Sequence, residues 1–127
     1  MGTTIITILL HSYGIAGEVM FFKFNIPLFK SLLVVYVGDE EQERWIKATG
    51  RPTEEVVFVG SDGKCYGSYL WLKRPELKLL AHEMSHFVDN FIDHVGINDR
   101  SGEVRAYVYG WGMDAVWSKL NKCREVR

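Results

Sequence analysis

This sequence of 127 residues has few cysteines, no long apolar run and almost no net charge. Its two cysteines, Cys65 and Cys123, lie far apart and form no Cys-x-x-Cys pair, so we expect reduced thiols in a cytoplasmic protein. The apolar run over residues 5–10 is too short for a signal peptide or a membrane span. A net charge of -1 gives no support to nucleic-acid or membrane-surface binding.

Apolar side chains, by contrast, are numerous enough to build one core. Hydrophobic residues make up 47% of the chain and aromatic residues 13%. No internal repeat, low-complexity run or linker divides the sequence. We therefore expect a single domain over residues 1–127.

The first half of the chain favours strands and the second half favours helices. Asp62-Gly63 is a hairpin signal, which predicts a turn between the last two strands. Because the strands precede the two longer helices, the sequence indicates an α+β domain with helices on one face of a small sheet. The predicted strands cover residues 3–11, 18–24, 31–37, 56–59 and 64–72, and the predicted helices cover 40–49, 75–95 and 103–121.

The segment His82-Glu83-Met84-Ser85-His86 is an H-E-x-x-H motif within the helix predicted over 75–95. Residues four apart on a helix share a face, so His82 and His86 can bind one metal ion, with Glu83 beside them. The alternative is an amphipathic helix with two histidines on a polar stripe. The flanking residues are largely apolar, which predicts a buried helix whose polar side chains need a partner, and a metal ion would supply one.

A catalytic zinc ion usually takes three protein ligands, and the candidates for the third lie downstream. Ile92 occupies the position of the next metzincin histidine, and His94 lies on a different helix face. Glu103 begins the following helix, after a loop long enough to reverse the chain. Ala106 and Gly110 leave a groove on the face of Glu103, which predicts close approach of the two helices. Alternatively, Glu103 merely favours the positive end of its helix.

Two runs, Leu80-Ala81-His82-Glu83-Met84-Ser85-His86 and Gly102-Glu103-Val104-Arg105-Ala106-Tyr107, resemble the minimal gluzincin metallopeptidases with their HExxH…E pattern. Small phage-encoded peptidase-like proteins and the SprT-like and ImmA/IrrE-like zinc domains have similar layouts. The resemblance covers residues 64–110. It implies a zincin-like fold: a small mixed β-sheet, an edge strand beside the zinc, and two C-terminal helices that carry the metal ligands.

The resemblance also implies a zinc-dependent peptidase. His82, His86 and Glu103 would bind Zn²⁺, and Glu83 would act as the general base on a zinc-bound water that hydrolyses the peptide bond. Tyr107 is the candidate for stabilising the oxyanion, although a core aromatic is an equal alternative. Thermolysin, a larger gluzincin, has a supporting aspartate where this chain has Tyr107.

A peptide or protein substrate would add to the edge strand of such a fold, for which residues 64–72 are the candidate. Asp89 and Asn90 could orient His86, or could be solvated helix positions. A second function is open: a phage accessory protein in the host cytoplasm that binds a host or virion protein with little proteolysis. A purely structural zinc site would prefer four Cys or His ligands, unlike this set.

Overall fold

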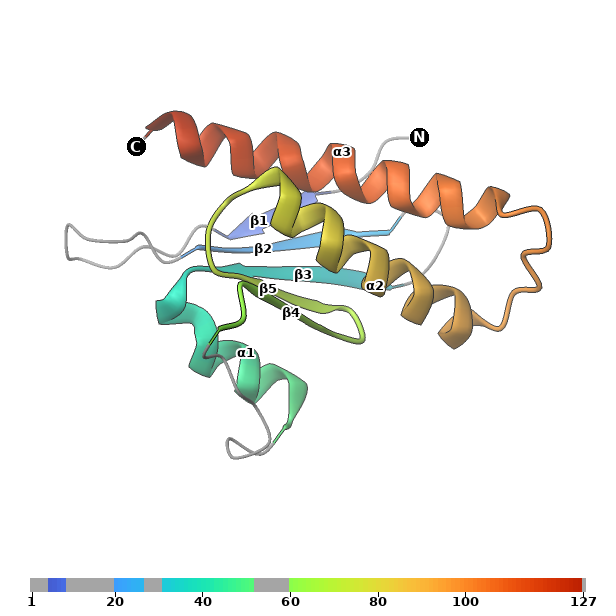
Figure 1. Cartoon of the computed structure of the whole chain (residues 1–127), viewed down its shortest axis with the longest axis horizontal. Helices are drawn as coiled ribbons and strands as arrows, with labels where there is room; N and C mark the ends of the chain where they lie inside the picture. The colour runs from blue at the N-terminus through green and yellow to red at the C-terminus, as the bar shows by residue number, and fades with distance from the viewer. Residues whose placement is uncertain (1–4, 9–19, 27–30, 52–59, 127) are drawn as a thin grey trace.

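The computed structural model describes residues 5–8, 20–26, 31–51 and 60–126, which form a five-stranded sheet and its helices (Figure 1). The expected α+β class is confirmed. No helix in these segments is long and apolar enough to cross a membrane. The strands are β1 (Ile5–Ile8), β2 (Met20–Asn25), β3 (Leu32–Val37), β4 (Gly63–Tyr66) and β5 (Tyr69–Leu72), and the helices are η1 (Asp39–Glu41, a 3-10 turn), α1 (Gln42–Thr49), α2 (Leu77–Val95) and α3 (Glu103–Val126).

The sheet is mixed and has the strand order β1-β2-β3-β5-β4. β3 and β5 are parallel, and the other neighbours are antiparallel. The single strand predicted over 64–72 is wrong, because a two-residue turn at Gly67 and Ser68 splits it into β4 and β5. Gly67 has a φ of 59°, which glycine adopts without steric cost. Among the described strands, β4 lies at the edge of the sheet and β5 lies inside it.

Both faces of the sheet are covered. Side chains alternate along β3, so that Leu33 and Val35 join the core under α2 and α3, whereas Val34 and Tyr36 contact the other cluster, around Trp45 of α1. The expectation of helices on one face was therefore incomplete. A strand buried on both sides reads as a continuous apolar run, as β3 does.

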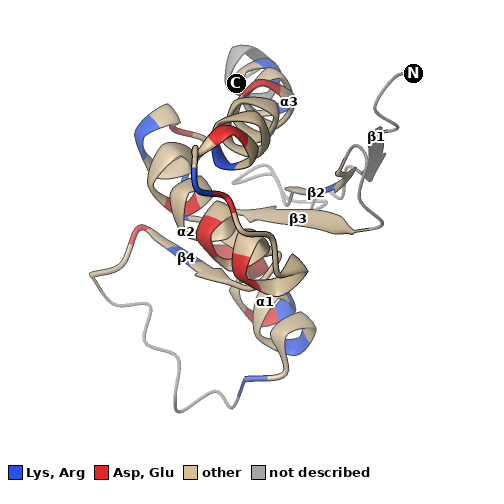
Figure 2. Ribbon diagram, turned by 90° about the vertical axis from the view of Figure 1, so that its right-hand side faces the viewer, with Lys and Arg blue, Asp and Glu red and all other residues tan. Residues whose placement is uncertain are grey.

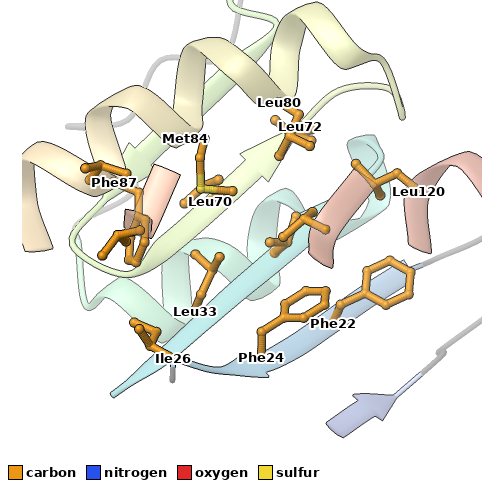
Figure 3. Packing of buried hydrophobic residues seen from close by; sticks show 14 of the residues in the cluster. Phe22, Phe24, Ile26, Leu33, Leu70, Leu72, Leu80, Met84, Phe87 and Leu120 are labelled. Atoms are coloured by element: carbon orange, nitrogen blue, oxygen red, sulfur yellow. The ribbon is translucent and has the colours of Figure 1, made fainter. Parts of the chain in front are cut away.

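The larger core lies between the sheet and the pair α2 and α3 (Figure 3). Each fully buried side chain of this size contributes roughly 1.5–3 kcal/mol relative to an exposed one. This layer fixes α2 against the strands and so positions the H-E-x-x-H motif. Its labelled members are Phe22, Phe24, Ile26, Leu33, Leu70, Leu72, Leu80, Met84, Phe87 and Leu120.

All three predicted helices are present. α2 ends at Gly96, whose φ of 70° suits a helix C-cap. Asp99 caps the start of α3 by accepting hydrogen bonds from the backbone N–H groups of Val104 (3.1 Å) and Arg105 (2.9 Å). The strand predicted over 56–59 lies outside the described residues, as do the outer parts of those predicted over 3–11 and 18–24.

Candidate functional site

α2 presents His82 and His86 on one face, with their ring centroids 5.0 Å apart. Both histidines are exposed, and the His82 side chain is 69% accessible. The expectation that the whole motif is buried is wrong. Leu80 and Met84 point from α2 into the core, and they lie on a different side of the helix from the two histidines. Of the histidines and the glutamate of the motif, only one residue is therefore buried.

That buried residue is Glu83, which is 5% exposed and lies against β4. A Cβ atom on Gly63 would stand 2.7 Å from Glu83 Oε2, so the carboxylate occupies the space that a side chain at Gly63 would take. From the sequence, Gly63 was predicted only as part of a turn. A glycine inside a strand is itself a signal of close approach by another group, and that signal was available.

Burial raises the pKa of Glu83 above its usual value, and the charges of His82, His86 and Lys64 act in the opposite direction. Glu83 Oε2 lies 4.0 Å from His82 Nε2, beyond hydrogen-bonding distance. A carboxylate with a raised pKa is better suited to accept a proton near neutral pH than an exposed one.

A pocket of about 410 Å³ opens between α2 and β4, and His82, Glu83 and His86 line it together with Cys65 and Asn90. Asn90 Nδ2 donates a hydrogen bond to Cys65 Sγ over 3.7 Å. Burial and the charge of Glu83 raise the pKa of the Cys65 thiol to about 12, while the Asn90 hydrogen bond lowers it. Cys65 is a free cysteine, as expected.

Glu103 does not reach this pocket. It is exposed at the start of α3, and α2 lies between α3 and β4 (Figure 2). An ion pair between Arg105 and Asp89 joins the start of α3 to α2, and Asp99 in the preceding loop caps that start. The antiparallel return of the chain was predicted, but it places Glu103 on the side of α2 away from β4.

The groove predicted on α3 also points elsewhere. Ala106 and Gly110 share the exposed face of Glu103, and nothing lies within 4 Å of a Cβ atom built on Gly110. Gly112 makes the close approach instead, because its Cβ atom would stand 2.5 Å from Met84 Sδ. The prediction that Ala106 and Gly110 make the close contact is therefore wrong, and Gly112 makes it from another face of α3.

Tyr107, the candidate oxyanion residue, is 48% exposed on α3 and does not line the pocket. Asp89 pairs with Arg105, and Asn90 with Cys65. A larger cavity, of about 930 Å³, lies beyond Asn90 and contains none of the predicted ligand or catalytic residues.

The fit to a catalytic zinc ion is therefore partial. Two imidazoles one helical turn apart suit the metal, but among the described residues no group of three His, Cys, Asp or Glu side chains is arranged to hold one. Comparisons of the chain with protein-family models, with curated proteins and with solved structures gave no significant match.

Proposed function

We propose that this protein is a zincin-like, zinc-dependent peptidase whose centre is the pocket between α2 and β4. The observation that carries the proposal is the buried Glu83 carboxylate beside two exposed histidines of the same helix. Burying a carboxylate is costly unless it gains a partner, so a position such as this one is more typical of a functional group than of a structural one. The adjoining edge strand supports a peptide as the substrate.

Each residue then has a definite task. His82 and His86 would hold a zinc ion, which supplies polarisation of the scissile carbonyl and activation of water. Glu83 accepts a proton at its carboxylate and returns it to the leaving amine. β4, at the sheet edge, can pair its backbone with an extended peptide and hold it along the pocket.

One observation favours a second candidate. The third ligand is not assembled among the described residues, as expected for a zincin-like protein that binds a host or virion protein without cutting it. In such a protein the pocket would recognise the partner, and Glu83 would not be needed for turnover.

Cleavage of a broad peptide library by the zinc-loaded protein separates these functions. We expect cleavage by wild type and a loss of about 10²–10⁴-fold in Glu83→Gln, the range for removal of a general base. Glu43→Gln, an exposed change on α1, is the matched control and should leave the rate unchanged. If cleavage is absent, or equal in all three proteins, the peptidase proposal is wrong and the zincin-like binding protein is favoured.

A further inference from the structure

The pocket contains one more side chain of a type that binds zinc. Of its lining residues outside the motif, Cys65 alone is a His, Cys, Asp or Glu. Thiolate sulfur is among the preferred ligands of zinc, and catalytic sites combine cysteine with histidine.

The register of β4 directs Cys65 towards α2. Gly63 and Cys65 are two residues apart and therefore share a face of the strand, and Gly63 lies against Glu83. Cys65 packs partly into the core beneath α2, and its sulfur contacts Asn90, one helical turn beyond His86. Cys65 thus lies opposite the stretch of α2 that carries the second histidine.

Bringing Glu103 to the histidines would disturb far more structure than bringing in Cys65. The start of α3 would have to leave its Asp99 cap and the Arg105–Asp89 ion pair and pass around α2. Cys65 makes two long sulfur hydrogen bonds, of 3.6 Å to the Gly67 carbonyl and 3.7 Å from Asn90. Cys65 already lines the same pocket as His82 and His86, although the three side chains as placed do not form a metal-binding group.

We propose that Cys65, in place of Glu103, is the third protein ligand of the metal site begun by His82 and His86. The proposal rests on the proposed function for the existence of that site. It goes beyond the HExxH…E resemblance, because it assigns the ligand to the edge strand instead of the last helix. The same strand would then hold both the metal and the substrate backbone.

Cobalt substitution tests this directly, because a thiolate bound to Co²⁺ gives a near-ultraviolet charge-transfer band that imidazole and carboxylate ligands do not. The proteins compared are wild type, Cys65→Ser, Cys123→Ser and Glu103→Gln, each loaded with Co²⁺ alone. We expect the band in wild type, Cys123→Ser and Glu103→Gln, and its loss in Cys65→Ser. Zinc affinity should fall in Cys65→Ser by more than the 10–100-fold typical of a residue that only supports a ligand.

Cys65→Ala and urea unfolding of each variant separate ligand loss from misfolding, since a folded Cys65→Ala that lacks the band supports the proposal. Metal binding that needs Glu103 but survives Cys65→Ser, or wild-type binding without the band, would overturn it, as would failure of wild type to bind Co²⁺. The peptidase proposal stands if Glu83-dependent cleavage occurs without the band. It fails, while Cys65 remains a ligand, if the band forms but no cleavage depends on Glu83.

Discussion

The absence of a side chain at Gly63 gives the Glu83 carboxylate its place beside β4. Because a Cβ atom at Gly63 would stand 2.7 Å from Glu83 Oε2 and 2.9 Å from Cγ, Gly63→Ala must displace the carboxylate. A shift of this size in a catalytic group lowers turnover by up to about a hundredfold. We expect Gly63→Ala to lose cleavage and to keep its bound metal, whereas Gly110→Ala, which meets no neighbour, keeps both. Unaltered cleavage by Gly63→Ala would show that the carboxylate position is not critical.

Glu41 is a second buried carboxylate, outside the pocket, and it bears on stability. It is fully buried, and neither of its oxygens accepts a hydrogen bond from the described residues, although Arg44 Nε approaches Oε1 to 3.4 Å. Burial raises the pKa of Glu41, the charge of Arg44 lowers it, and Glu40 raises it. The folded state therefore binds the proton more tightly than the unfolded state.

The stability that Glu41 contributes is thus present below its ordinary pKa and is lost as pH rises through the raised value. We expect Glu41→Met to increase the free energy of unfolding at neutral pH by about 1 kcal/mol, because it removes a buried charge. This gain in stability should shrink as the pH falls below 4.5, the ordinary pKa of a glutamate. Urea unfolding across pH measures this, with the exposed Glu43→Gln as control. A Glu41→Met protein less stable than wild type at neutral pH would show that the Arg44 pair is net stabilising.

At the scale of elements, periodicity was sufficient for the helices and for β3. It missed the turn at Gly67 and Ser68. The hairpin predicted at Asp62-Gly63 stays a prediction, because its first strand, over 56–59, lies outside the described residues. β5 pairs in parallel with β3 as well as antiparallel with β4, so residues 64–72 contribute two strands. That parallel pairing joins segments distant in the sequence, which no local pattern reports.

Two glycines of α3 give a matched pair of tests. Gly110→Ala adds a methyl group in open space, so we expect the gain in helix propensity, about 1 kcal/mol, as added stability. Gly112→Ala would place its Cβ atom 2.5 Å from Sδ of the fully buried Met84. Overpacking of this kind costs about 1–3 kcal/mol, so a net loss is expected. Urea unfolding of both variants checks the contact between the helices, and equal gains would contradict it.

At the scale of the whole molecule, the motif was sufficient to predict that His82, Glu83 and His86 lie together, but the sequence did not show that Glu103 lies outside their pocket. The sequence gives the spacing from His86 to Glu103, and this spacing allows the two helices to lie side by side. It does not say which side of α2 receives α3. That choice depends on how α2 packs on the sheet. One side of α2 contacts β4, and its other side contacts α3 (Figure 2).

Metal binding should stabilise the whole fold, because the two histidines adopt their spacing only in the folded helix. With zinc at about 100 times its Kd, mass action adds about 2.7 kcal/mol to the free energy of unfolding. We expect this increment in wild type and its loss in His86→Asn. His94→Asn is the matched control, because His94 lies on the same helix but outside the pocket between α2 and β4. Urea unfolding with zinc and after chelation measures the increment. If the zinc-dependent gain in stability disappears equally in both variants, the metal binds elsewhere on α2. The pocket between α2 and β4 would then not be the metal centre.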